Sequence, residues 1–189
     1  MKFFKVSSEI REAGSIWDPN AKYDDCFNGY LSEEKRQIEE ALNMQSKYGK
    51  RSDYLFIFNS LEAALLFLIR CLKGGRIYSV TINPEDIVAR CDMNLVECMM
   101  CLLNYRTDEQ KQKSRPEGFG SIAKAYWESG KTFIPCWEYL VKKATTQKCI
   151  FQVNNQQHSL LCKEYQDEGC TILEMPTFKK LYMEIYLSK

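Results

Sequence analysis

Two short apolar runs flank a longer one between residues 51 and 78, and this is the most strongly patterned part of the chain. Residues 54–58 are aromatic or branched, as expected of a buried strand. Leu61 and residues 63–71 are apolar on nearly every helical face, and a helix of that kind is buried on all sides. The glycines at 74 and 75 end this helix, and residues 76–82 alternate as a second strand does. We therefore predict a strand–helix–strand unit around which the remaining chain folds.

Capping residues predict where three helices begin. Asn59, with a glutamate three residues later, has the spacing of a capping box at the start of the central helix. Ser32 opens an amphipathic helix that we expect to end at Gly49. Asp92 precedes an apolar run over residues 95–103, which predicts a third helix.

The other predicted elements are shorter. They are strands at residues 3–7, 133–141 and 148–153, a turn with one helical turn beginning at Asn83-Pro84, helices at 122–127 and 158–165, and an exposed loop at 106–120. Residues 178–187 fit a strand and a helix equally well. Because the strands are too irregularly spaced for a βαβ array, we predict an α+β fold in preference to a doubly wound sheet.

The length of 189 residues fits one large domain, and we expect a single domain over residues 1–189. The 26 lysine and arginine residues balance 25 acidic ones, so the net charge of +1 gives no electrostatic reason to expect nucleic acid or an anionic membrane as a partner. The longest apolar run, residues 63–69, is too short to cross a bilayer. The first residues contain no apolar core of a secretory signal.

Nine cysteines without a secretory signal favour reduced thiols in the cytoplasm, and their odd number argues against a closed disulfide framework. Cys98 and Cys101 have CxxC spacing but lie in an apolar helix, so we expect two buried thiols and no zinc. Cys136 has only one possible histidine partner, His158, and nothing in the sequence brings the two together. We expect His158 itself to be a surface or partly buried helix residue. The chain has no glycine-rich phosphate loop.

Glu138 is the most suggestive single residue, because it is a carboxylate on a strand whose neighbours, Trp137 and Tyr139, are aromatic. Burying a carboxylate there is costly unless it is paired or used. Four segments follow one another in order along the chain: Phe4-Lys5-Val6-Ser7, Arg51-Ser52 with the strand at 54–58, residues 77–94, and residues 137–141. In this order, and above all in the WEYLV segment, the chain resembles uncharacterised bacterial domains related to ADP-ribosyltransferases. The resemblance covers about residues 1–153 and leaves residues 154–189 unassigned.

The resemblance implies a split β-sheet core with flanking helices that holds NAD as substrate. By position, Glu138 takes the place of the catalytic glutamate, and Lys5 that of the arginine or histidine that grips the nicotinamide ribose. The other residues placed around the cofactor are Ser7, Arg51, Ser52, Tyr54, Phe56 and Phe58, while Arg51, Arg76 or Arg90 would hold the pyrophosphate. Lys5 departs from the pattern, since lysine lacks the planar fork of arginine and the neutral ring of histidine.

Cleavage of the nicotinamide–ribose bond creates an oxocarbenium-like centre, which a fixed carboxylate stabilises. The implied function is that of an NAD-dependent ADP-ribosyltransferase with a protein acceptor, or an NAD glycohydrolase, in a toxin or in defence. Two alternatives remain: a catalytically inactive relative that binds a protein or a nucleotide, which Lys5 favours, and a structural or interaction protein without a small ligand. For Glu138 the alternative is a rim residue or an ion-pair partner. The acceptor, the oligomeric state and the role of residues 160–189 are not predicted.

Overall fold

The computed structural model describes residues 2–19, 33–71, 74–104, 119–131 and 137–168, together with residues 176 and 179. The chain divides into two compact units, each assembled from segments that are far apart in the sequence. Unit 1 comprises Met1–Trp17, Ile57–Ile82 and Ala144–Lys189, and unit 2 comprises Asp18–Phe56 and Asn83–Lys143. The expectation of a single domain stays a prediction.

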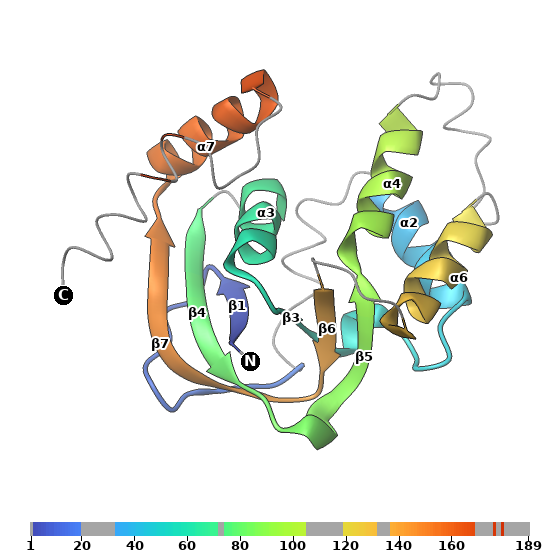
Figure 1. The fold of residues 1–189 in the computed structure, drawn as a ribbon, viewed down its shortest axis with the longest axis horizontal. Coiled ribbons are helices and arrows are strands. Elements are labelled where there is room, and N and C mark those ends of the chain that lie inside the picture. Colours follow the sequence, from blue (N-terminus) through green and yellow to red (C-terminus); the bar gives the residue numbers. More distant parts are fainter. Residues whose placement is uncertain are drawn as a thin grey trace. The chain divides into compact units, whose positions relative to one another are not determined.

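The strands of unit 1 pair antiparallel in the order β2-β7-β4-β1, with the end of β3 next to β1. Their bounds are Phe3–Ser7 for β1, Ile16–Trp17 for β2, Leu55–Phe58 for β3, Gly75–Thr81 for β4 and Ala144–Val153 for β7. The longest ladder joins β4 to β7, which run side by side in Figure 1. The strand predicted at residues 3–7 is confirmed, and the strand predicted at 148–153 begins earlier, at Ala144.

Helix α3 (Leu61–Cys71) contacts β1 in unit 1. Leu65 and Leu68 are fully buried, whereas Leu66 and Phe67 are only half-buried. The prediction of a helix buried on all sides is therefore wrong for one flank. Apolar residues on every face of a helix permit complete burial, but the packing partners decide which face receives it.

The caps of the unit 1 helices differ in part from the prediction. Helix α3 is capped by Ser60, whose Oγ accepts the N–H of Ala63 at 3.1 Å, so the cap lies one residue after the predicted Asn59. Helix α7 (Asn155–Glu168) begins with a reciprocal pair. The N–H of Gln157 donates to Oδ1 of Asn154 at 2.9 Å, and the N–H of Asn154 donates to Oε1 of Gln157 at 3.0 Å. This capping box starts the helix before the predicted residue 158.

Gly74 lies in the turn that leads into β4, and its φ of +116° is one that L side chains rarely adopt. A Cβ at this position would lie 3.0 Å from Oδ1 of Asn155 and 3.2 Å from the carbonyl oxygen of Val153. The glycine predicted to end the central helix is therefore required both by backbone conformation and by close packing.

Unit 2 combines an antiparallel strand pair with helices that contact one another. Its strand order is β3-β6-β5, and helices α2, α4 and α6 lie together in Figure 1. The bounds are Glu33–Met44 for α2, Met93–Asn104 for α4, Gly120–Glu128 for α6, Ile87–Asp92 for β5 and Trp137–Val141 for β6. Single turns of 3₁₀-helix are η1 (Arg51–Asp53), η2 (Pro84–Asp86) and η4 (Ser129–Lys131).

Two of the helix starts predicted for unit 2 are confirmed, whereas α6 begins at Gly120, two residues before the predicted residue 122. Asp92 caps α4, because its Oδ1 accepts the N–H of Asn94 at 2.9 Å, and Pro84 opens η2. Helix α2 ends at Met44 and so stops before the predicted Gly49. Several predicted features lie outside the described residues: the Ser32 cap, residues 106–118 of the loop, residues 133–136 of a strand, and nearly all of residues 178–187.

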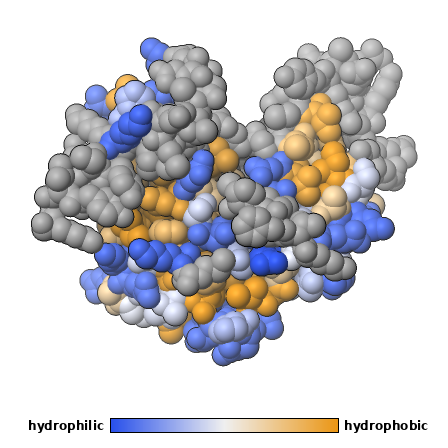
Figure 2. Space-filling view, viewed as in Figure 1, coloured by the Kyte–Doolittle hydropathy of each residue, from blue (hydrophilic) through white to orange (hydrophobic). Residues whose placement is uncertain are grey.

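Helices and antiparallel strands occur in both units, which confirms the predicted α+β class. The likeness to the ADP-ribosyltransferase core stays a prediction. On the face drawn in Figure 2, hydrophobic residues lie between hydrophilic ones. Exposed large apolar side chains include Ile10, Ile16, Met44, Leu102 and Leu160. In the part of the chain that the structure describes, no helix has the length and apolar character needed to cross a bilayer.

Candidate functional site

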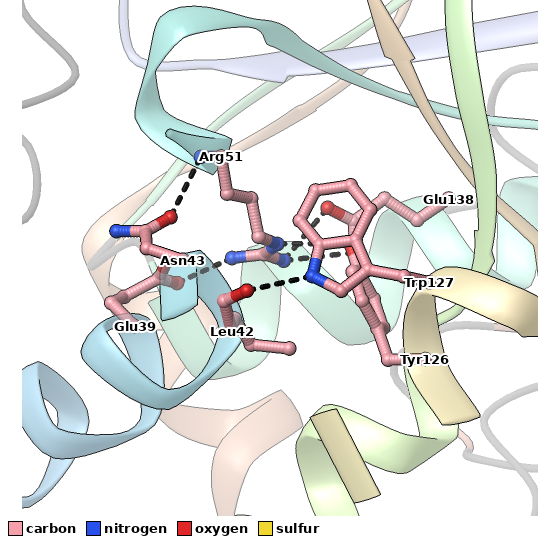
Figure 3. A network of polar contacts seen from close by, with 7 residues as sticks. All are labelled: Glu39, Leu42, Asn43, Arg51, Tyr126, Trp127 and Glu138. Carbon is pink, nitrogen blue, oxygen red and sulfur yellow. Dashed lines mark hydrogen bonds and ion pairs between the residues drawn. The ribbon is translucent and has the colours of Figure 1, made fainter. Parts of the chain in front are cut away.

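A buried ion-pair network surrounds Arg51 in unit 2 (Figure 3). Arg51 lies in η1, just before β3, and is only 4% exposed. Its Nη2 donates to both carboxylate oxygens of Glu138, at 2.7 and 2.9 Å. Its Nε donates to the hydroxyl oxygen of Tyr126 at 2.9 Å, and its Nη1 pairs with Glu39. All three guanidinium nitrogens therefore have acceptors.

Two helices and a strand of unit 2 supply these partners. Glu39 and Asn43 are four residues apart on α2, so they share a helix face. Asn43 accepts the backbone N–H of Arg51 at 2.8 Å. Tyr126 comes from α6 and Glu138 from β6. The network thus connects the chain entering β3 to α2, α6 and β6.

Aromatic rings enclose the guanidinium of Arg51. Its Cζ lies 4.4 Å from the ring centre of Phe56 and 5.5 Å from that of Tyr126. Such ring faces attract a cation. Trp127, the next residue of α6, packs edge-on against Tyr126 at 5.1 Å between ring centres, and its Nε1 donates to the carbonyl oxygen of Leu42 at 2.7 Å (Figure 3). The ionic groups therefore lie in an apolar surrounding that strengthens their attraction.

Burial changes the ionisation of the groups around Arg51. It raises the pKa of Glu138, and the charge of Arg51 opposes that rise. Cys91 lies opposite Glu138 on β5, and its pKa is raised to about 12, first by burial and then by the Glu138 charge. Burial also raises the pKa of Tyr126 well above its usual value. At neutral pH Cys91 and Tyr126 are therefore uncharged, and the Tyr126 hydroxyl can donate to Glu138.

Glu138 is closed off from solvent in this conformation. It is 1% exposed, and both of its oxygens accept from Arg51. The other carboxylate of the network differs, because the Glu39 side chain is 16% exposed and still reaches water. A buried carboxylate is tolerated when it is paired and hydrogen-bonded. The arrangement therefore supports the chain around β3, and a substrate cannot contact Glu138 while the pair is intact.

Among the sequence-predicted site residues of unit 2, those that meet in this network are Arg51, Phe56 and Glu138. Tyr54 instead donates its hydroxyl to the carbonyl oxygen of Tyr48. Ser52 is half-buried beside Arg51 in η1. The binding roles of these residues stay predictions.

The sequence-predicted site residues of unit 1 are Lys5, Ser7 and Phe58. Lys5 Nζ lies 5.9 Å from the ring centre of Trp17, and the Ser7 hydroxyl oxygen accepts the N–H of Glu9 at 3.1 Å. Phe58 is fully buried and packs against Phe67 with 5.2 Å between ring centres. Each residue has a local partner in unit 1, and its role toward NAD stays a prediction.

The arginines predicted to hold pyrophosphate also have protein acceptors. Arg76 donates to the carbonyl oxygen of Ser8 at 3.3 Å, and Arg90 donates to that of Gly130. Arg51 is the one that lies within the buried network. Its guanidinium is committed to carboxylates of the protein itself, so it is not presented to a ligand in this conformation.

Sequence reasoning does not single out Glu39, Asn43 or Tyr126. The spacing of Glu39 and Asn43 is a signal that could have found them, since two polar side chains four residues apart share a helix face. Tyr126 carries a weaker signal, because an aromatic residue in an amphipathic helix is ordinarily core. Its hydroxyl, however, needs a partner once the ring is buried.

The cysteine and histidine predictions have mixed outcomes. Cys98 is exposed, so the prediction of two buried thiols at the CxxC spacing is wrong for Cys98. Its neighbour Met99 is fully buried. The side chain of Cys101 and all of Cys136 lie outside the described residues. His158 is half-buried on α7, as predicted. Within the described ranges no three His, Cys, Asp or Glu side chains are grouped as metal ligands would be.

Comparison with known proteins adds no family to this description. No protein-family model matches the chain, and no curated protein matches it either.

Proposed function

We propose that the chain is an NAD-binding relative of the ADP-ribosyltransferases in which Glu138 supports the fold and does not act on the substrate. NAD as the ligand follows from the resemblance of residues 1–153. The structural role of Glu138 is inferred from its burial, since it is 1% exposed and both of its oxygens accept from Arg51.

Transfer of ADP-ribose from NAD requires a carboxylate that the substrate can reach, and Glu138 is buried. A carboxylate that stabilises an oxocarbenium-like centre has to lie beside the reacting ribose. Glu138 would first have to leave Arg51, and uncoupling a buried ion pair costs about 3–5 kcal/mol. Lys5, at the place of an arginine or histidine, also favours an inactive relative, because lysine cannot form the same planar contacts.

A second candidate is an active NAD-dependent ADP-ribosyltransferase or NAD glycohydrolase, in a toxin or in defence. The observation that favours it is the grouping of Glu138, Tyr126 and Cys91, all with raised pKa values. Groups with shifted pKa values cluster at catalytic sites, although structural ion-pair networks shift them too. In this case Arg51 would have to release Glu138 when NAD binds.

Calorimetric titration with NAD and an assay of nicotinamide release separate the two candidates. The proteins to compare are the wild type, Glu138→Gln and the control Glu40→Gln, which alters an exposed carboxylate next to Glu39 on the same helix. We expect all three to bind NAD and none to release nicotinamide. Release by the wild type and Glu40→Gln, but not by a folded Glu138→Gln protein, would establish the active enzyme. If none of the three proteins binds NAD, the remaining hypothesis is a structural or interaction protein that has no small ligand.

A further inference from the structure

The only histidine of the chain lies beside a cysteine in unit 1. His158 and Cys162 are four residues apart on α7, so they share a helix face. The Sγ atom of Cys162 is 3.6 Å from Nδ1 and 3.7 Å from Nε2 of the imidazole. Both side chains are half-buried, so a small reagent can reach the thiol.

The carbonyl oxygen of Ile69, in the last turn of α3, determines which ring nitrogen of His158 carries a proton. It lies 3.1 Å from Nε2. A carbonyl oxygen only accepts, so Nε2 is the protonated nitrogen of this contact and Nδ1 of the neutral ring is left as an acceptor. Nδ1 is therefore able to take the thiol proton of Cys162. A nucleophile, a base and a group that orients the base are the parts of an activated thiol.

We infer that Cys162 exchanges with small disulfides such as glutathione disulfide, and that His158 is the base of this exchange. Nδ1 takes the thiol proton while Sγ attacks one sulfur of the reagent. A new S–S bond joins Cys162 to half of the reagent, and the old S–S bond breaks. The departing thiolate takes the proton from His158, so one thiol is oxidised and another is released. The inference does not depend on NAD binding.

Thiol–disulfide exchange fits this site because it needs only a line of approach to the sulfur and a place for the proton. Burial raises the pKa of Cys162, so little thiolate forms unless a base assists. The alternative is a purely structural role, in which both side chains satisfy the Ile69 carbonyl at the end of α3, 3.6 Å from Sγ. A structural role predicts no effect of His158 on the rate of exchange.

Cys149 provides an internal control within unit 1. It is exposed, its Sγ contacts the carbonyl oxygen of Phe151 at 3.6 Å, and burial raises its pKa as well. The single imidazole of the chain contacts Cys162 and the carbonyl oxygen of Ile69. Cys149 is therefore the more exposed thiol but lacks the neighbouring imidazole that Cys162 has.

The test is to incubate the full chain with glutathione disulfide and to follow the mixed disulfide at each cysteine by peptide mass spectrometry. We expect Cys162 to react at least about tenfold faster than Cys149, and His158→Gln to slow Cys162 by roughly 10²-fold, which is the lower end of general-base effects. Neither His158→Gln nor the neighbouring control Ser159→Ala should change the rate at Cys149.

Equal rates at Cys162 and Cys149 in the wild type would overturn the inference, as would an unchanged Cys162 rate in folded His158→Gln. Should the substitution unfold the protein, Cys149 would react faster too, and the comparison within the wild type then decides by itself.

Discussion

A single arginine organises the polar interior of unit 2. Arg51 is surrounded by two carboxylates, a hydroxyl and aromatic faces, and its backbone N–H is bound by Asn43. The planar guanidinium presents five donors in a rigid fork, whereas lysine carries a compact ammonium on a flexible stem. Glu138 depends on Arg51 more than Glu39 does, because the Glu138 side chain is only 2% exposed. Removing Arg51 would leave this carboxylate buried without its cation.

We predict that Arg51→Met lowers the free energy of unfolding by about 3–5 kcal/mol at neutral pH, the usual effect of breaking a buried pair from one side. Methionine retains much of the side-chain volume, so the loss reports on charge more than on packing. Urea unfolding against the wild type measures it. The control is Lys124→Met on the exposed side of α6, which should stay within about 0.5 kcal/mol of the wild type.

The loss in Arg51→Met should depend on pH. Burial already raises the folded-state pKa of Glu138 above its usual 4.5, and without the opposing charge of Arg51 it rises further. The folded state then binds the proton more tightly than the unfolded state, so ionisation of Glu138 destabilises the fold as pH rises. We expect the loss to be largest above the raised pKa and to shrink as the pH falls toward 4.5. A loss that is constant across a pH series of unfolding experiments would contradict this.

At the scale of elements, local patterns predict much of the fold. The helix starting after Asp92, the 3₁₀ turn at Pro84 and the strand Phe3–Ser7 all depend on neighbours in the sequence, and all are present. Patterns indicate the type of element better than its burial. The helix after Ser60 has apolar residues on every face, yet Leu66 is half-buried, because burial depends on partners elsewhere in the chain.

We predict that Leu65→Ala destabilises the protein by about 2–5 kcal/mol, since Leu65 is fully buried and its loss leaves a cavity. Leu66→Ala should cost clearly less, because its side chain is half-buried and solvent can fill the space. Both substitutions remove the same atoms from adjacent positions of α3, so each is the control of the other. If urea unfolding shows equal losses of stability for the two variants, α3 does not bury Leu65 in preference to Leu66 as this structure shows.

The cap of α3 gives a second test at this scale. Ser60→Ala removes the oxygen that accepts the N–H of Ala63, and it should cost about 1 kcal/mol. Asn59→Ala is the matched control, since Asn59 occupies the position before the cap. We expect a smaller loss there, as read from the thermal unfolding midpoint. A larger loss for Asn59→Ala would restore the cap predicted from the sequence.

At the scale of the whole molecule, the contacts that define the network are too distant in the sequence to be predicted from local patterns. Arg51 and Glu138 are 87 positions apart, and Arg51 and Tyr126 are 75 apart. The sequence does show that a carboxylate between Trp137 and Tyr139 needs a partner or a use, because burying it unpaired is costly. The sequence does not show which cation pairs with Glu138. From the sequence, Arg51 is predicted as a pyrophosphate ligand.

The same limit applies to function. The order of segments suggests an NAD protein, but catalysis depends on whether Glu138 can reach a substrate. Its burial beneath Arg51 favours a binding relative over an enzyme. Nothing local in the sequence distinguishes a carboxylate presented to a cleft from one enclosed by an ion pair, since both lie on a strand between aromatic residues.

A double-mutant cycle between Arg51 and Glu138 measures whether the two side chains form a buried ion pair. The unfolding free energies of the wild type, Arg51→Met, Glu138→Leu and the double variant are compared at neutral pH. If the two residues form a buried pair, each single substitution strands a charge, whereas the double replaces the pair with apolar groups and is often nearly neutral. We predict that the double variant is more stable than Arg51→Met alone, with a coupling energy of roughly 3 kcal/mol. Losses that add to within about 0.5 kcal/mol would show that Arg51 and Glu138 act independently and do not form a stabilising buried pair.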